Sequence, residues 1–179
     1  MWGDCLQICR SAGAKTASTG HRVIDYELLL REGVSGVLAR VRAAREALDP
    51  HTPEFHEKNI TYQSMEISLS ALIRFGARAR AVLLALAEQT EDAERRAQLE
   101  TLSDIFAQVP EHPARTFYEA IQSMWFVQFA LCLIDDVSLT GHPDRYLYPY
   151  YKADLEAGKI SPAFAQELMD CIWVKLNDL

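Results

Sequence analysis

Residues 113–126 read PARTFYEAIQSMWF. Within this string Phe117, Ile121 and Trp125 recur every four residues, which places them on one face of a helix. Proline is rare inside helices but is accepted in the first turn. We therefore expect the helix to begin at the proline or the alanine that opens the string.

The apolar segment from Met124 to Ile134 is interrupted only by Gln128. It is too short to cross a bilayer, and a helix that is apolar on all sides needs protein on all sides. Either a compact helical bundle buries this segment, or part of its intended cover is absent from the chain. A strand over residues 129–137, in place of a continued helix, is also compatible with the sequence.

Helical signals dominate the chain from Asp25 onward, and no repeat or convincing alternating strand occurs. Thr52-Pro53-Glu54 offers a hydroxyl cap, a proline in the first turn and an acid, so a long helix is expected to start there. The sequence thus predicts a mainly α protein. The expected helices are 26–31, closed by Gly33; 34–48; 53–88; 93–108, capped within Thr90-Glu91-Asp92; and 163–176, capped by Ser161.

The composition bounds the possible partners. The chain has 179 residues, 49% hydrophobic and 24% charged, which is ordinary for a globular domain. Its formal net charge of −7 argues against nucleic acid or an anionic membrane surface as a partner. Residues 1–10 lack the basic start and apolar run of a signal peptide. We expect a cytoplasmic protein with no membrane partner.

The four cysteines, at positions 5, 9, 132 and 171, form neither a metal-ligand pattern nor a disulfide framework. Cys5 and Cys9 are about one helical turn apart, but two ligands do not make a zinc site. No nearby histidine or cysteine supplies the others. We expect reduced thiols and no bound metal.

Two polar segments carry candidate binding residues. His21 follows a glycine in a predicted loop, and a neutral imidazole can donate or accept a proton near pH 7. Without other information, a solvated or helix-capping histidine is the preferred interpretation of that position. Residues 135–145 lie between two apolar runs. Polar side chains in such a segment can bind a small substrate, or they can bond to the unpaired backbone groups at the ends of the flanking helices. These side chains include Ser138, Thr140, His142 and Asp144.

Several strings, in this order, resemble the pyruvate formate-lyase-like domain of glycyl radical enzymes, especially its dehydratase and lyase branch. Residues 20–27, GHRVIDYE, are similar to the family's G-H-x-x-x-D-Y-E segment. Residues 74–79 and 93–96, RFGARA and AERR, are similar to its central helical pair. Residues 113–122 are the most specific match. The resemblance covers the chain from about Thr19 to its end.

The resemblance implies substrate-binding roles for three residues. His21 matches a histidine that lines the substrate pocket of the family's dehydratases, which implies contact with a substrate hydroxyl. Ser138 is nearest to a pocket serine just before the family's G-R-x-D-Q-Y-L-Y-P-Y-Y segment. That segment reads GHPDRYLYPYY here, so His142 and Pro143 replace the expected residues beside the pocket. The candidate substrate-binding residues are His21, Ser138 and His142, and the departure leaves the substrate class open.

The same resemblance points to two elements that this sequence does not contain. The family's thiyl cysteine occurs in a G-C-x-E context, whereas Asp, Ile, Leu and Asp precede the four cysteines here. Its radical glycine occurs in an R-V-x-G-Y-type loop, and neither Arg-Val pair of this chain continues in that way. No catalytic residue is therefore assigned, and we expect this chain alone to be inactive.

The implied fold is the helical N-terminal portion of the ten-stranded α/β barrel of glycyl radical enzymes. We expect residues 1–179 to form a partial pyruvate formate-lyase-like domain, with 1–19 as a loop-rich lead-in and 20–179 helical. As a fragment, the chain would supply scaffold and part of the pocket for cleaving a C–O, C–N or C–C bond in a small polar metabolite.

The implied complete enzyme binds no metal or organic cofactor, and a separate radical-SAM activase installs its glycyl radical. The expected partners are the remainder of the enzyme, the activase and, for the full-length protein, a second copy in a homodimer. Two alternatives stay open. One is a fragment of a pyruvate formate-lyase-type acyl transferase, and the other is a helical interaction module without catalysis.

Overall fold

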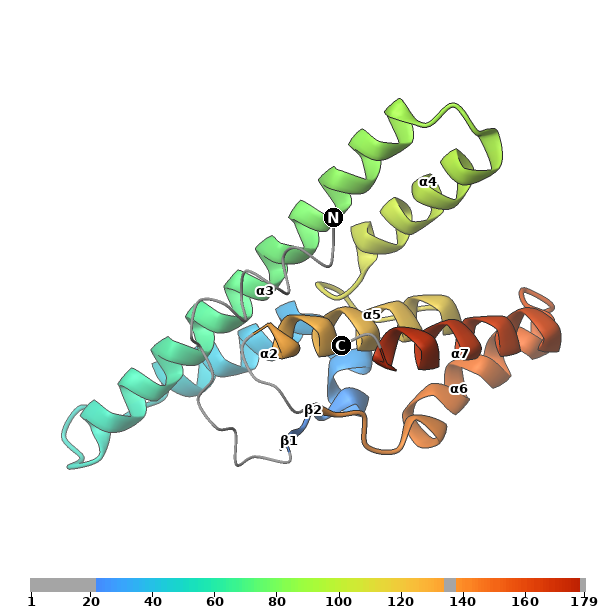
Figure 1. Ribbon diagram of the computed structural model, residues 1–179. Helices are drawn as coiled ribbons and strands as arrows, with labels where there is room; N and C mark the ends of the chain where they lie inside the picture. Colours follow the sequence, from blue (N-terminus) through green and yellow to red (C-terminus); the bar gives the residue numbers. More distant parts are fainter. Residues whose placement is uncertain (1–21, 134–137, 178–179) are drawn as a thin grey trace. The chain divides into compact units, whose positions relative to one another are not determined.

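The computed structural model describes residues 22–133 and 138–177, most of which are helical (Figure 1). The mainly α fold class predicted from the sequence is confirmed. Within these residues, no helix combines the length and the apolar character needed to cross a membrane. The elements are β1 (Arg22–Val23), α2 (Tyr26–Glu46), α3 (Phe55–Gln89), α4 (Ala93–Gln108), α5 (Phe117–Cys132), β2 (Ser138–Leu139), α6 (Pro143–Glu156) and α7 (Pro162–Asn177).

The chain divides into two compact units. One unit comprises residues 1–26 and 116–179, and the other comprises residues 27–115. We refer to them as the β-pair unit, which contains β1, β2 and α5–α7, and the long-helix unit, which contains α3, α4 and nearly all of α2.

In the long-helix unit, α3 and α4 lie side by side (Figure 1). Asp92 caps α4 because its carboxylate accepts the backbone N–H groups of Glu94 and Arg95, as the sequence predicts. The predicted cap of α3 was wrong. The Thr52 hydroxyl instead donates to the Asp49 carbonyl at 2.9 Å, so a turn precedes the helix and α3 begins three residues after Thr52.

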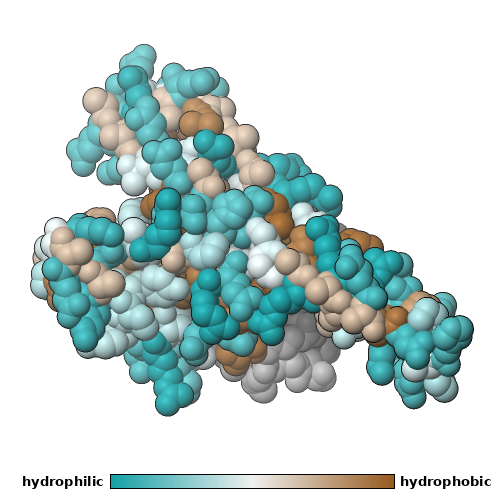
Figure 2. Space-filling model, turned by 180° about the vertical axis from the view of Figure 1, so that it is seen from behind, coloured by the Kyte–Doolittle hydropathy of each residue, from teal (hydrophilic) through white to brown (hydrophobic). Residues whose placement is uncertain are grey.

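Helix α3 is 35 residues long, about 52 Å at 1.5 Å per residue, and only Gly76 and Ala87 in it are buried. Several apolar residues of α3 face solvent, including Ile67 at 69% exposure and Val82 at 46%. Hydrophobic patches interrupt the otherwise largely hydrophilic surface in Figure 2. Within the described residues, α3 therefore exposes more apolar side chains than a helix on a protein surface usually does.

Gly33 divides α2 into the two helical segments that the sequence predicts. Its φ of 68° and ψ of 170° are non-helical, and they free backbone N–H groups at the start of the second segment. Val34 and Ser35 donate those groups to the carbonyls of Pro110 and Glu111, both at 2.9 Å. The break therefore ties α2 to the segment that follows α4, whose Val109–Pro110 peptide bond is cis.

In the β-pair unit, α5 is the most buried helix, and α6 and α7 pack against it. Most residues from Met124 to Phe129 of its apolar run are buried, which supports the bundle interpretation for this part of the segment. The helix starts at Phe117, with the Thr116 hydroxyl accepting the Glu119 N–H at 3.1 Å, so the predicted start was three or four residues too early. Ser161 caps α7 as predicted, accepting the Phe164 N–H at 3.1 Å.

Asp154 of α6 holds the start of α5. Its side chain is almost fully buried, and one carboxylate oxygen accepts the Phe117 N–H at 2.6 Å. The other oxygen lies 3.5 Å from the ammonium of Lys159, which is itself exposed. A carboxylate at a helix N-terminus both accepts an otherwise unpaired N–H and interacts favourably with the helix dipole.

Asp154→Ala is expected to lower the free energy of unfolding by about 3 kcal/mol, because it leaves a buried N–H without an acceptor and opens a cavity. Asp154→Asn keeps an acceptor oxygen and should cost only about 1 kcal/mol. Urea denaturation followed by circular dichroism measures both. Equal losses in the two variants would contradict the capping role.

Candidate functional site

The candidate site is built around the pairing of β1 with β2. The two strands are parallel, with Arg22 opposite Ser138 and Val23 opposite Leu139. Parallel strands require a long connection, and here the whole of the long-helix unit lies between them in the sequence. The pairing brings together the two sequence regions from which the candidate binding residues were chosen.

The three predicted substrate-binding residues are distributed around this pair. His21 lies outside the described residues and directly precedes Arg22 in the sequence. Ser138 is in β2, where it is paired with Arg22. His142 is the residue before α6, is exposed, and forms no side-chain hydrogen bond to cap the helix. Ser138 and His142 thus share one short segment, and the strand pairing links that segment to the residue after His21.

Two stacked tyrosines lie beneath this segment in the interior of the β-pair unit. The rings of Tyr26 and Tyr146 have centroids 5.0 Å apart with 30° between their planes. The Tyr26 hydroxyl donates to Oε1 of Gln128 in α5 at 2.6 Å. The Tyr146 hydroxyl donates to the Thr140 carbonyl at 2.7 Å and lies 2.9 Å from Sδ of Met124.

Both phenols are held in the neutral form. Burial raises the pKa of Tyr26 well above its usual value, and the nearby Cys132 thiol adds to that rise. Burial also raises the pKa of Tyr146, with smaller contributions from Tyr26 and Asp144. The pair therefore provides hydroxyl donors for structural hydrogen bonds, and neither group ionises near neutral pH.

From the sequence alone, neither these tyrosines nor Gln128 are candidate site residues, although one signal for a buried polar contact exists. Gln128 is the only polar residue in the apolar run of α5, and it is 3% exposed. A buried amide needs hydrogen-bond partners, so a lone glutamine in such a run predicts a buried polar contact. The sequence gives no indication that the partner is Tyr26.

The pyruvate formate lyase-like family model matches residues 6–179. The chain belongs to this family. The match extends over nearly the whole chain, and it confirms the resemblance to glycyl radical enzymes of the dehydratase and lyase branch.

Individual members of the pyruvate formate lyase-like family show how much of such a protein this chain represents. It is 35% identical to the isethionate sulfite-lyase of Oleidesulfovibrio alaskensis over 156 residues, 85% of this chain and 19% of that protein. The glycerol-bound structure of the B12-independent glycerol dehydratase from Clostridium butyricum is 30% identical, with a TM-score of 0.84, over 98% of this chain and 24% of that one.

The structure of a glycyl radical enzyme from Archaeoglobus fulgidus is similar to this chain to a comparable extent. It is 32% identical, with a TM-score of 0.82, over 98% of this chain and 23% of that one. The chain therefore spans about a fifth of the length of the relatives it matches.

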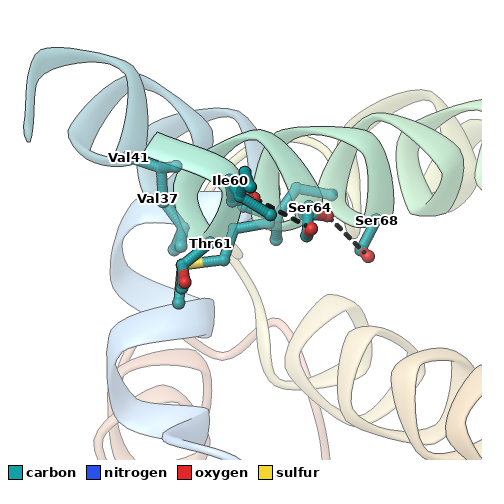
Figure 3. A pocket seen from close by; sticks show the side chains of 8 residues that line it. Val37, Val41, Ile60, Thr61, Ser64 and Ser68 are labelled. Carbon is teal, nitrogen blue, oxygen red and sulfur yellow. Dashed lines mark hydrogen bonds between the residues drawn. The ribbon is translucent and has the colours of Figure 1, made fainter. Parts of the chain in front are cut away.

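A separate groove of about 570 Å³ lies between α2 and α3 of the long-helix unit (Figure 3). The hydroxyls of Ser64 and Ser68 donate to backbone carbonyls one turn earlier in α3, so their protons are already engaged within the helix. None of its eight lining residues is ionisable, so this family member has no acid–base chemistry there. The lining residues are Val37, Val41, Ile60, Thr61, Ser64, Met65, Ser68 and Leu69.

In residues 22–133 and 138–177, no group of three or more histidine, cysteine and acidic side chains could hold a metal ion. Of the cysteines in that part of the chain, Cys132 is partly exposed, Cys171 is exposed, and neither is in a disulfide. Cys5 and Cys9 lie outside the described residues.

Proposed function

We propose that this chain is the part of a glycyl radical lyase or dehydratase that forms scaffold and one section of the substrate-pocket wall. The observation that carries the proposal is the family match over residues 6–179 together with a length only about a fifth that of the relatives. The G-C-x-E and R-V-x-G-Y strings that carry radical chemistry in the family do not occur in the 179 residues.

In the proposed complete enzyme, a thiyl radical abstracts a hydrogen atom from a substrate carbon, and a neighbouring bond then breaks. The residues of this chain act on the substrate rather than on the radical. His21 hydrogen-bonds a substrate hydroxyl, and Ser138 and His142 line the same pocket. Isethionate and glycerol, named with two relatives, both carry a hydroxyl group, so a small hydroxylated metabolite is the substrate class that this assignment favours.

The exposed apolar residues of α3 support the proposal. Folded proteins usually bury surfaces such as a groove lined mainly by apolar side chains and exposed apolar residues such as Ile67, Val82 and Leu86. In the proposed enzyme the rest of the polypeptide covers them. The activase and a second enzyme subunit complete the set of proposed partners.

The coding DNA after the codon for Leu179 tests whether the chain is such a part. We expect an open reading frame, either directly after the Leu179 codon or in an adjacent gene, that encodes both a G-C-x-E and an R-V-x-G-Y string. A stop codon with no complementing gene nearby would favour the alternative, a helical interaction module without catalysis. Two of the relatives are a lyase and a dehydratase by name, so an acyl transferase is the less supported alternative.

Ile67→Asp provides a second test. It asks whether the rest of the proposed enzyme covers the exposed apolar side chains of α3. In the 179-residue chain the side chain is 69% exposed, so the substitution should change the free energy of unfolding by no more than about 0.5 kcal/mol. In the complete enzyme it should destabilise by about 3 kcal/mol, because it places an unpaired charge in a buried contact. Thermal denaturation of both proteins measures the difference, and equal small effects would contradict the proposed cover.

A further inference from the structure

Residues 138–142 carry two of the proposed substrate-binding residues, Ser138 and His142. The ladder between this segment and β1 is only two residues long on each side. Strand pairs of that length have little stability of their own. Other contacts must therefore hold the backbone of the segment in place.

Tyr146 makes a direct contact of this kind from the beginning of α6. Its hydroxyl donates to the Thr140 carbonyl at 2.7 Å, midway along the segment. Its ring is 9% exposed and stacks on Tyr26, whose own hydroxyl bonds Gln128 of α5. The donor is thus fixed in the interior of the β-pair unit, while the acceptor belongs to the segment.

Gly141 shows how closely the same segment approaches β1. Its φ of +66° lies in the region that favours glycine, and a Cβ built there would be 2.9 Å from Cγ1 of Val23. The backbone is therefore held at position 140 by a hydrogen bond and at position 141 by close packing. Both constraints act between the two candidate residues.

We propose that Tyr146 is a positioning residue of the substrate site, whose hydroxyl bond to Thr140 fixes the backbone that carries Ser138 and His142. This inference rests on the proposed function for the role of those two residues. The ring of Tyr146 contributes to the core, whereas its hydroxyl orients the segment. Tyr146→Phe separates the two contributions, because phenylalanine keeps the stacked ring and loses only the donor.

Hydrogen exchange in the 179-residue chain tests the contact without a substrate. Tyr146→Phe should speed amide exchange of residues 138–142 about tenfold and leave the exchange of α5 unchanged. Tyr148→Phe is the matched control, since it removes the hydroxyl of a tyrosine on the same helix that is 58% exposed. Equal exchange of residues 138–142 in the two variants would overturn the proposal.

Steady-state kinetics of the complete enzyme, with isethionate and glycerol as probes, tests the positioning role. Tyr146→Phe should lower kcat/KM about tenfold relative to Tyr148→Phe, mainly by raising KM, because one fixed backbone contact is lost. The glycyl radical content per subunit should be unchanged. A fall in radical content, or kcat/KM equal to that of the control, would overturn the positioning role.

The two proposals fail in different ways. A wild-type complete enzyme with no radical and no turnover would contradict the proposed function, and the exchange measurement would still decide whether Tyr146 holds the segment. A wild-type enzyme that turns over while Tyr146→Phe behaves like Tyr148→Phe would contradict only the inference about Tyr146.

Discussion

Gly33→Ala is expected to destabilise the 179-residue chain by at least about 3 kcal/mol. Two causes add. The φ of +68° with ψ of 170° is a conformation that residues with a side chain rarely adopt. In addition, a Cβ at this position would overlap the Glu111 carbonyl oxygen and the His112 backbone, which cannot move without breaking the hydrogen bonds from Val34 and Ser35.

Gly158→Ala is the matched control for this prediction. Gly158 has nearly the same φ, +67°, but a Cβ there meets nothing within 4 Å. Its substitution should therefore show the conformational cost alone, about 1 kcal/mol. Urea denaturation of the three proteins gives the difference. If the two variants lose the same stability, close approach of Gly33 to residues 111–112 is not what holds α2 in place.

His21→Ala is expected to have the largest effect on catalysis among the proposed site residues. In the complete enzyme it should reduce kcat/KM for isethionate or glycerol roughly 10- to 100-fold, because a substrate hydroxyl loses its hydrogen-bond partner in a site closed to water. Radical installation, measured by electron paramagnetic resonance, should be unaffected, since the radical is carried elsewhere in the proposed enzyme.

His56→Ala provides the control, because His56 is exposed near the start of α3 and belongs to no proposed site. Its kinetics should match those of the wild type. Unchanged kinetics in His21→Ala as well would remove His21 from the substrate site, while leaving the family membership of the chain intact.

Local signals in the sequence predicted the helices whose boundaries are set by neighbouring residues. Asp92 caps α4 because its carboxylate reaches N–H groups two and three residues away, which is a purely local interaction. Helix α6 was not predicted, because Pro149 lies in its interior and such a residue normally ends a helix. Here the fourteen-residue helix continues through Pro149, with buried Tyr146 and Leu147 in its first half.

Contacts between distant parts of the chain were less predictable. The β1–β2 pair has two residues on each side, so it produces no periodic pattern, and its partners are separated by most of the sequence. The bond between Tyr26 and Gln128 joins residues 102 positions apart in the sequence, and no local pattern encodes such a contact. The sequence predicts a long helix here, but no local pattern predicts that Ile67 and Val82 of α3 are exposed in the described part of the chain.

For the candidate site, too, local motifs were predictable from the sequence, whereas contacts between distant residues were not. The resemblance suggests His21, Ser138 and His142 as candidates, and the strand pairing places Ser138 opposite the residue that follows His21. The sequence did not reveal that Tyr146, which matches the family's pattern, donates a hydrogen bond to the segment between Ser138 and His142. That role depends on the direction of one hydroxyl in the folded chain.

Electron paramagnetic resonance tests the central claim most directly, namely that this chain carries substrate-pocket residues but no radical chemistry. The 179-residue protein is incubated anaerobically with a radical-SAM activase and S-adenosylmethionine, next to the glycyl radical enzyme of Archaeoglobus fulgidus with its own activase. We expect a glycyl radical doublet from the Archaeoglobus fulgidus enzyme. From the 179-residue chain we expect neither a doublet nor turnover of glycerol, choline, trans-4-hydroxy-L-proline or isethionate. A glycyl radical doublet from the 179-residue chain alone would contradict the central claim.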